Sequence, residues 1–203
     1  MIRRGLMLAG VLLLFSVTAR AQLTPRYQAS AGFDFTSFLQ TSNGPRLDML
    51  GGQGDFAYNV NRWVGAAGDV AYTYNRQTSM TDAGVNGTTT NILTFMAGPR
   101  FYPLGHHKIT LFGEAMFGAG YYTSKQPPIP PYGGTTVSSV RWAWLGGVGA
   151  DYRVKDRWSV RANLDYVSTR FLQSTYGSQG SERLTIGVVY SWGVAGVRRK
   201  KIR

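Results

Sequence analysis

Residues 183–192, Arg-Leu-Thr-Ile-Gly-Val-Val-Tyr-Ser-Trp, decide the fold class. One set of alternate positions in this stretch is wholly apolar, and the other set is mainly polar or small. Successive side chains of a β-strand point to opposite faces of the sheet, whereas an amphipathic helix repeats every 3.6 residues. The alternation therefore predicts a strand with one apolar face. The apolar positions are Leu184, Ile186, Val188, Tyr190 and Trp192.

The same alternation recurs in seven earlier blocks of the chain, and no stretch after residue 22 keeps a helical period. Glycine is spread through these blocks, with 26 glycines in 203 residues, rather than confined to turns. The pattern predicts eight strands and no second domain. The eight blocks cover residues 27–35, 53–60, 64–75, 93–101, 109–121, 142–153, 160–169 and 183–192.

The connections between the blocks alternate in length. Short links are expected at 61–63, 102–108 and 155–157, and long polar links at 39–47, 77–87, 124–137 and 171–181. Short turns at one end and long loops at the other are typical of an up-and-down antiparallel barrel. We therefore expect an all-β protein that closes as an eight-stranded antiparallel up-and-down barrel over residues 22–192.

The distribution of charge between the two faces distinguishes a membrane barrel from a soluble one. One face carries the aromatic and aliphatic residues, and the other carries nearly all the charges and many glycines. In a soluble barrel those glycines would lie on the solvated wall, where each weakens a strand by roughly 0.5–1 kcal/mol. Inside a narrow barrel they make room for long polar side chains. The sequence thus favours a transmembrane β-barrel, with a soluble exported barrel rich in core aromatics as the alternative.

The polar face contains six acidic and five basic residues, close to balance. Buried charges require partners, so we interpret this set as ion-pair networks that plug the lumen. A proton relay or ion path through the lumen is the alternative. The expected lumen residues are Asp34, Asp55, Asp69, Arg100, Glu114, Arg141, Asp151, Arg153, Arg161, Asp165 and Arg183.

Aromatic residues gather near the expected short turns. Side chains of this kind form girdles where headgroups meet hydrocarbon in membrane barrels. We expect one such girdle at the short-turn end of the barrel. Its members would be Tyr27, Trp63, Tyr102, Trp158, Tyr190 and Trp192.

The two ends of the chain differ from the barrel segment in composition. Residues 1–21 have two early arginines, a short apolar run and a final Ala-Arg-Ala, which predicts a cleaved signal peptide and a mature chain that starts at Gln22. An uncleaved N-terminal anchor is the alternative. Residues 193–203 form a basic tail with five cations. Since the ends carry eight of the 22 basic residues, the high pI gives little support to nucleic-acid binding.

Several kinds of active site have no candidate residues here. The chain has no cysteine, and its two histidines, His106 and His107, are adjacent. Disulfide scaffolds, thiolate zinc sites and cysteine nucleophiles are therefore excluded. The pair Gly147 and Gly149 lies within an expected strand and not before a helix, so it is no nucleotide loop. We assign no catalytic residue, cofactor site or metal site.

The eighth block resembles the assembly signal of outer-membrane barrels, carried here by Thr185, Gly187, Tyr190 and Trp192. Together with Met96-Ala97-Gly98-Pro99-Arg100-Phe101 and residues 147–153, it makes residues 26–192 similar to the small outer-membrane-protein β-barrel family, which includes barrels resembling outer membrane proteins A and X. The resemblance implies a location in the cell outer membrane. It also implies three partners: the membrane lipids, a secretion signal peptidase and the barrel-assembly machinery. The tail departs from the family pattern, because the signal usually ends the chain.

Such barrels serve as anchors, adhesins, small pores and a few lipid-modifying enzymes. We expect a non-enzymatic protein with a structural or surface-interaction role, whose long loops contact an extracellular ligand. A narrow porin-like channel is the first alternative. The second is a lipid A-modifying enzyme, which would need a His and a Ser two strand positions apart and facing lipid. His106 and His107 lie in an expected turn without such a Ser.

Overall fold

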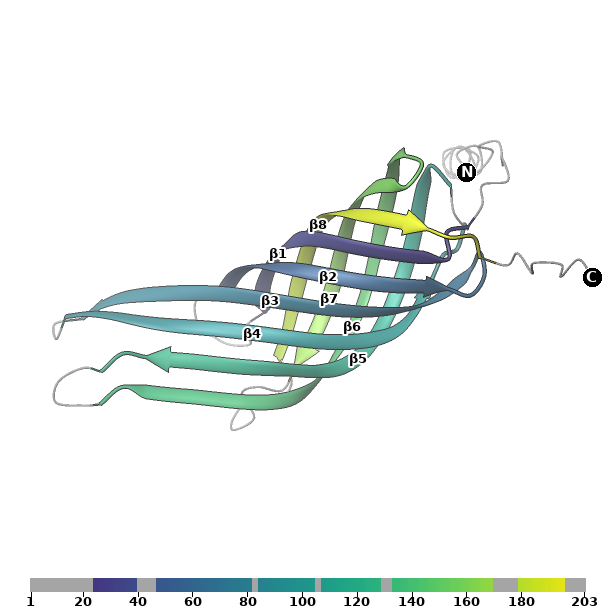
Figure 1. Ribbon diagram of the computed structural model, residues 1–203. Coiled ribbons are helices and arrows are strands. Elements are labelled where there is room, and N and C mark those ends of the chain that lie inside the picture. Colours follow the sequence, from purple (N-terminus) through teal and green to yellow (C-terminus); the bar gives the residue numbers. More distant parts are fainter. Residues whose placement is uncertain are drawn as a thin grey trace, which may run out of the picture.

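The computed structural model describes residues 24–39, 47–81, 84–104, 107–128, 133–169 and 179–195. Each strand pairs antiparallel with the next, and β8 pairs with β1, so the sheet closes into a barrel (Figure 1). The prediction of an all-β, eight-stranded, up-and-down antiparallel barrel is confirmed. The strands are β1 (Tyr27–Leu39), β2 (Leu47–Asn59), β3 (Val64–Thr81), β4 (Gly84–Phe101), β5 (Ile109–Gln126), β6 (Thr135–Lys155), β7 (Trp158–Thr169) and β8 (Gln179–Trp192).

The three short connections lie at one end of the barrel, here called the short-turn end, as the sequence predicted. The β2–β3 turn shows why so few residues suffice. The side-chain Oδ1 of Asn61 accepts hydrogen bonds from the backbone N–H of Trp63 at 2.7 Å and of Val64 at 2.9 Å. An Asn side chain in this role replaces a backbone turn. The opposite end is called the long-loop end.

Two of the expected long loops are shorter than the sequence predicted, because the strands beside them are longer. The loop expected at residues 77–87 is wrong, because β3 continues to Thr81 and β4 begins at Gly84, with pairing through to the Thr81–Gly84 pair. The loop expected at 124–137 shortens in the same way, because β5 ends at Gln126 and β6 begins at Thr135. These segments lie beyond the closed wall, so neither face needs to be apolar and the alternation disappears. Period-two analysis therefore did not detect them.

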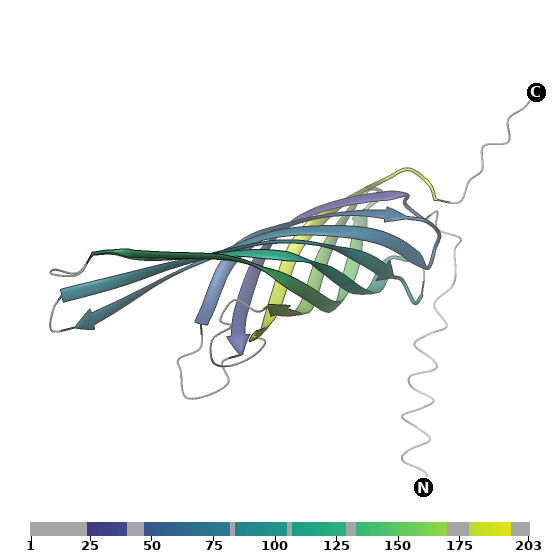
Figure 2. The same ribbon diagram turned by 90° about the horizontal axis from the view of Figure 1, so that it is seen from below.

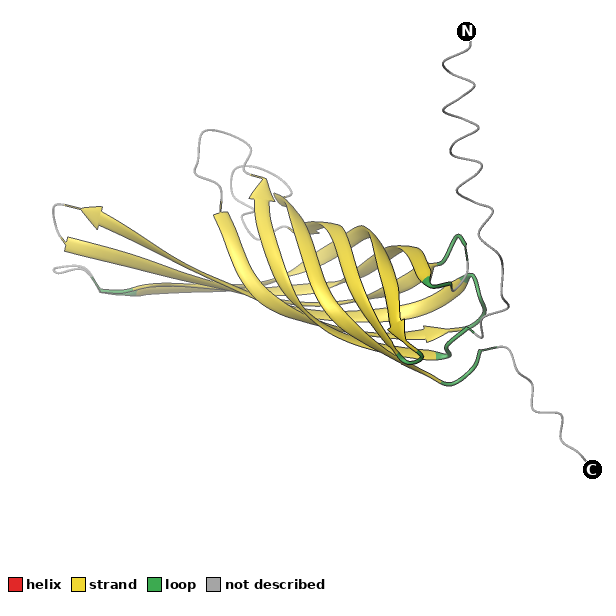
Figure 3. Ribbon diagram, turned by 90° about the horizontal axis from the view of Figure 1, so that it is seen from above, coloured by secondary structure: helices red, strands yellow, loops and turns green. Residues whose placement is uncertain are grey.

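Four strands extend beyond the closed wall at the long-loop end (Figures 1 and 2). Pairing of β2 with β3 starts at Leu50–Tyr74, and pairing of β6 with β7 starts at Ala143–Thr169. The β3–β4, β4–β5 and β5–β6 ladders continue past these points. Residues 75–81, 84–90, 122–126 and 135–142 therefore extend as the β3–β4 and β5–β6 strand pairs (Figure 3), which are joined by β4–β5 pairing as far as Thr89–Lys125. This extension is named here the protruding sheet.

The outer wall of the barrel is apolar. Phe33 on β1 is 84% exposed, and large apolar side chains of the other strands also project outward. Single exposed apolar residues are ordinary, but a continuous apolar belt requires an apolar environment. Polar and charged side chains fill the inside. Further members of the belt are Leu50, Phe56, Val70, Phe95, Phe101, Leu111, Phe117, Val148, Leu164, Ile186 and Val188.

No helix in the described part of the chain is long and apolar enough to cross a membrane.

Part of the interior is apolar rather than ion-paired. Met96 on β4 and Met116 on the adjacent β5 belong to one cluster inside the barrel and are almost fully buried. Unbranched methionine side chains adapt to irregular gaps, which suits a cylinder lined by small residues. The lumen is therefore closed by packed side chains as well as by charges. This apolar cluster comprises Ala57, Ala67, Met96, Met116, Ala143, Leu145 and Val167.

Candidate functional site

Asp55 on β2 is the centre of the charge cluster nearer the short-turn end. Its Oδ1 lies 3.0 Å from Nη1 of Arg100, and its Oδ2 lies 2.7 Å from Nη1 of Arg161. Ser30 on β1 donates a further hydrogen bond to Oδ2. The two arginines come from β4 and β7, so side chains from opposite parts of the wall meet on one carboxylate. The contact closes the lumen at this level.

Each of these arginines also has a carboxylate of its own. Arg100 Nε lies 2.7 Å from Oε2 of Glu114 on β5. Arg161 makes a two-bond contact with Asp151 on β6, Nε to Oδ1 at 2.7 Å and Nη2 to Oδ2 at 2.8 Å. Such paired bonds fix the guanidinium plane as well as its position. This part of the lumen therefore has five charged groups in one connected set.

An aromatic ring lies between the two arginines. The guanidinium carbons of Arg100 and Arg161 are each 4.7 Å from the ring centroid of Phe112, a distance typical of cation–π contact. Tyr102 packs 6.3 Å from the same ring and donates a hydrogen bond of 2.9 Å to Oε1 of Gln28. The predicted placement of Tyr102 in the interfacial girdle is therefore wrong. Its side chain lies on the inward face, fully buried.

Arg183 on β8 is the centre of a second cluster, nearer the long-loop end. Its Nε and Nη2 donate to Oδ2 of Asp165 at 3.0 and 2.9 Å, and its Nη1 donates to Oδ1 of Asp69 at 3.1 Å. Asn163 joins the two clusters, because its Nδ2 donates to Glu114 at 3.1 Å and to Asp165 at 3.0 Å. The lumen network is thus continuous along the barrel axis.

Asp34 on β1 is a buried carboxylate without an ion pair among the described residues. Its Oδ1 accepts a hydrogen bond from Thr185 at 2.7 Å, and Thr185 lies equally close to Oε1 of Gln53. The second oxygen, Oδ2, has no hydrogen-bond partner in the described structure. Asp34 therefore carries a charge that the network does not neutralise directly.

Two of the basic residues expected in the lumen lie elsewhere. Arg141 is exposed, because its part of β6 belongs to the protruding sheet, where the inward face no longer faces a closed lumen. Arg153 is half-buried at the short-turn end, next to the register shift between Arg153 and Lys155. The predicted balance of six acids against five bases is therefore wrong. In the part of the chain that the structure describes, six buried carboxylates share the lumen with three buried guanidiniums.

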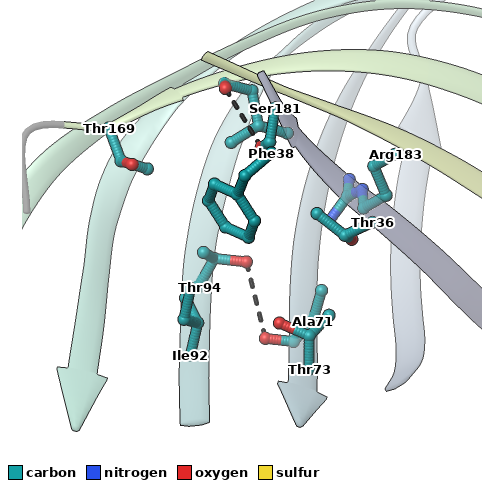
Figure 4. A pocket seen from close by; sticks show the side chains of 10 residues that line it. Thr36, Phe38, Ala71, Thr73, Ile92, Thr94, Thr169, Ser181 and Arg183 are labelled. Carbon is teal, nitrogen blue, oxygen red and sulfur yellow. Dashed lines mark hydrogen bonds between the residues drawn. The ribbon is translucent and has the colours of Figure 1, made fainter. Parts of the chain in front are cut away.

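A small cavity, lined in part by Arg183, lies toward the long-loop end (Figure 4). Thr36, Phe38, Thr73 and Thr169 are among its lining residues, and its volume of about 30 Å³ leaves room for one or two water molecules. Thr36 and Thr169 are buried, and their hydroxyl oxygens have no hydrogen-bond partner in the described structure.

The residues of the predicted assembly signal lie on both faces of β8. Thr185 points into the lumen, whereas Tyr190 and Trp192 project outward at the short-turn end, where their rings stack at 5.6 Å. The strand ends at Trp192, and Gly193 turns the chain with a left-handed φ of 72°, a conformation that side chains disfavour. A role in assembly remains a prediction. The predicted signal peptide, His106 and the basic residues 198–203 lie outside the described residues.

His107 lies in the turn between β4 and β5. Its backbone N–H donates to Oγ1 of Thr110 at 3.2 Å, and that hydroxyl donates back to the His107 carbonyl at 3.1 Å. Both hydrogen bonds involve the backbone of His107, and they stabilise the turn. Among the described residues, no group of three potential ligands is placed to hold a metal ion.

The sequence analysis did not assign roles to Phe112, Gln28, Gln53 and Asn163. All four are buried, and three of them place amide groups in the lumen network. Each occupies an inward position of its strand. The alternation of inward and outward positions, called strand parity below, is therefore the sequence signal that could have identified these residues. Phe112 is harder to predict from the sequence, because an aromatic residue on a polar face breaks the pattern. Its role follows only from the contacts of the two guanidiniums with its ring.

Comparisons with known proteins agree with this architecture. The attachment invasion locus protein Ail of Yersinia pestis, solved with the heparin analogue sucrose octasulfate, aligns with a TM-score of 0.60 at 19% identity, over 84% of this chain and 100% of that one. Neisserial surface protein A aligns with a TM-score of 0.59 at 13% identity, over 82% and 97%. OprG of Pseudomonas aeruginosa gives 0.55 at 13%, over 87% and 100%. These likenesses show the fold.

A comparison with curated protein sequences returned no match. The family model of the outer membrane protein β-barrel domain matches residues 7–191, which include all eight strands up to the penultimate residue of β8. The apolar outer wall and the polar, filled lumen are what a bilayer requires of such a barrel. The chain belongs to the outer membrane β-barrel family and is a protein of the cell outer membrane.

Proposed function

We propose that this outer-membrane barrel is a non-enzymatic anchor that presents its protruding sheet outside the cell to bind a polyanionic glycan. The protruding sheet is the observation that carries the proposal, because four strands continue past the point where the wall closes. In outer-membrane barrels the short turns face the periplasm and the longer connections face outside. The sheet would therefore stand on the cell surface.

A cationic pair on the protruding sheet supports a negatively charged ligand. Arg76 on β3 pairs with Thr89 on β4, and Thr89 pairs with Lys125 on β5. Directly paired residues share one face, so the two cations lie on the same side, about 10 Å apart over two strand spacings. Both are exposed, and neither has an ion pair among the described residues. Ail, which has the same fold, was solved with a sulfated sugar.

The closed lumen supports an anchor rather than a channel. The side chains of Arg100, Arg161 and Arg183 cross it and are held by carboxylates from several strands. An eight-stranded barrel is only wide enough for its own side chains to fill. Ion flow would require these buried pairs to separate.

Binding of fluorescent heparin to intact cells tests the proposed function. Heparin added outside reaches only the surface-exposed part of the barrel, so the basic tail, expected on the periplasmic side, does not contribute. We expect cells that display the protein to bind heparin, and cells that display the R76Q/K125Q double variant to lose most of that binding. The R62Q/K108Q variant is a matched control, because it removes the same charge from two short turns.

Equal heparin binding by R76Q/K125Q and the parent protein would reject the proposed ligand site. Surface display is measured in the same cells with an epitope tag, so that a loss of display is not counted as a loss of binding. Mass spectrometry of lipid A from the same cells tests the non-enzymatic part. A change in lipid A that depends on expression would overturn it.

A further inference from the structure

Six aromatic side chains form a continuous layer on the outward face at the short-turn end, across the seam between β8 and β1. Ring centroids are 4.9 Å apart for Trp158–Tyr190, 5.6 Å for Tyr190–Trp192 and 5.7 Å for Trp192–Tyr27. Tyr27 continues to Tyr58 at 5.5 Å. We name this layer the aromatic panel. Its members are Tyr27, Phe56, Tyr58, Trp158, Tyr190 and Trp192.

Arg26 borders the panel on the β1 side. Its Nη2 donates a hydrogen bond of 2.8 Å to the hydroxyl of Tyr58. The guanidinium carbon lies 5.4 Å from the ring centroid of Tyr58 and 5.9 Å from that of Tyr27. The side chain therefore has a defined position at the edge of the aromatic surface, although it is exposed.

Arg157 borders the panel on the β7 side. Its Nη1 donates to the hydroxyl of Tyr190 at 3.3 Å. Its carbonyl oxygen accepts a hydrogen bond of 2.8 Å from the backbone N–H of Ser191, which ties the β6–β7 turn to β8. Two guanidiniums, each held by a tyrosine hydroxyl, thus stand on either side of the seam.

Neither guanidinium has a carboxylate partner among the described residues. Asp156 is the neighbour of Arg157 in the same turn, yet it makes no ion pair there. The three lumen arginines contrast with this, since each of them has two carboxylates. Hydrogen bonds to phenols leave the positive charge of Arg26 and Arg157 available for an anion from outside the protein.

We propose that the aromatic panel, with Arg26 and Arg157, is a binding site for one anionic phospholipid of the periplasmic leaflet. The headgroup phosphate would accept hydrogen bonds from the two guanidiniums, which planar N–H groups make well to phosphate. The acyl chains would lie along Phe56, Trp192 and the outward apolar side chains that precede Trp192 on β8. The site goes beyond the surface function proposed above and does not depend on it.

The geometry fits this ligand. Arg26 precedes β1 and Arg157 precedes β7, so only β8 lies between their strands, and the two backbones are separated by two strand spacings, about 10 Å, and by two residues along β8. To meet on one phosphate, the two guanidiniums would turn from the hydroxyls of Tyr58 and Tyr190 toward the seam, over a reach that long arginine side chains allow. Aromatic rings of this kind lie at the level where headgroups meet hydrocarbon, which puts the cations at the height of the phosphates. Each basic residue near an anionic surface adds about 1 kcal/mol to lipid affinity.

The other short turns carry a weaker form of the same arrangement. Arg62 lies over the ring of Trp63 at 4.8 Å, and Lys108 over the ring of Tyr152 at 5.5 Å. Each of these is a single cation beside a single ring, and they stand on different turns. They offer a matched control, because removing both changes the net charge of the rim by the same amount as removing Arg26 and Arg157.

Quenching of tryptophan fluorescence by lipids with brominated acyl chains tests the site. A background in which Trp63, Trp142 and Trp144 are replaced by Phe leaves Trp158 and Trp192, both in the panel, as the emitting residues. The full mature chain is folded in phosphatidylcholine vesicles, and brominated phosphatidylglycerol or brominated phosphatidylcholine replaces the host lipid in steps. Heat-dependent gel mobility confirms that every variant is folded.

We expect phosphatidylglycerol to bind next to the panel more tightly than phosphatidylcholine. The preference should fall about fivefold for each guanidinium removed in R26Q, R157Q and their double variant, which corresponds to about 1 kcal/mol each. R62Q/K108Q should keep the parent preference. Equal quenching by the two lipids in the parent protein would overturn the proposal. An equal fall in both double variants would also overturn it, since only the net charge of the rim would then matter.

Discussion

Arg161 and Asp55 lie 106 residues apart in the chain and three strands apart around the wall, yet Nη1 and Oδ2 are 2.7 Å apart inside the barrel. The contact crosses the lumen rather than following the wall. It brings β7 and β2 into one network with β4, through Arg100. Closure of the lumen therefore depends on pairs that no local sequence pattern specifies.

Removing an arginine of this network should destabilise the barrel. Arg100→Leu leaves Glu114 without its ion pair and Asp55 with only one of its two. Loss of one partner of a buried pair costs about 3–5 kcal/mol, because an uncompensated charge stays buried. The free energy of unfolding by urea in lipid vesicles should fall by about this amount, with strand content by circular dichroism unchanged at zero urea.

Arg141→Leu is the matched control for this substitution. Arg141 stands on the same set of alternate positions but is exposed on the protruding sheet. Its removal should change the free energy of unfolding by no more than about 0.5 kcal/mol. Similar losses for the two variants would show that the network is not what stabilises the barrel.

A methyl group at residue 147 should disturb the second charge cluster. A Cβ at Gly147 would overlap Oδ1 of Asp165, whose other oxygen is held by Arg183. Overpacking of this kind costs about 1–3 kcal/mol. Gly146→Ala is the control, since a Cβ there faces outward with its closest contact at 3.9 Å, on the Trp144 ring. We expect Gly147→Ala to lower the urea midpoint of unfolding clearly more than Gly146→Ala does. Equal midpoints for the two variants would contradict the predicted overlap with Asp165.

Neutralising Asp34 should stabilise the barrel at pH 7. The enclosed lumen holds six carboxylates and three guanidiniums, and Asp34 is the carboxylate without an ion pair among the described residues. Asp34→Asn keeps an oxygen that can accept from Thr185 and removes one negative charge. The urea midpoint should rise, whereas Asp156→Asn, in an exposed turn, should leave it unchanged. A lower midpoint for Asp34→Asn would mean that the charge at this position is needed.

The hydroxyl of Tyr102 should contribute measurably to stability. Tyr102→Phe removes the 2.9 Å hydrogen bond to Gln28 and leaves a buried amide oxygen without its donor. An unsatisfied buried acceptor costs about 1–3 kcal/mol. Tyr121→Phe removes a hydroxyl from an exposed position on the outer face and should cost less than about 0.5 kcal/mol. Equal urea midpoints for the two variants would contradict the buried contact.

Strand parity made most of the fold predictable. A strand that separates lipid from a packed interior must alternate, so residues such as Phe33 and Asp34 could be assigned to opposite faces from their order alone. The short turns were equally predictable. The same logic fails for residues 77–81 and 84–87, where β3 and β4 continue beyond the closed wall and the sequence carries no alternation.

Placement along the barrel axis was not predictable from parity. Arg141 and Arg161 have the same parity, but only Arg161 stands at a height where the wall is closed. Tyr102 follows a strand end, as the girdle residues do, but it occupies an inward position of its strand, and its side chain lies in the lumen. The choice of partner for each lumen arginine depends on the shear of the closed barrel, and a single sequence does not reveal it.

The central claim is that arginine and carboxylate side chains close the lumen. Single-channel recording in planar bilayers tests this claim most directly. The purified, refolded mature protein should give no steady ion current over a range of voltages, because Arg100, Arg161 and Arg183 with their carboxylates fill the cross-section. A steady current that disappears when Arg100 or Glu114 is replaced would contradict the account, since those side chains would then line an open path.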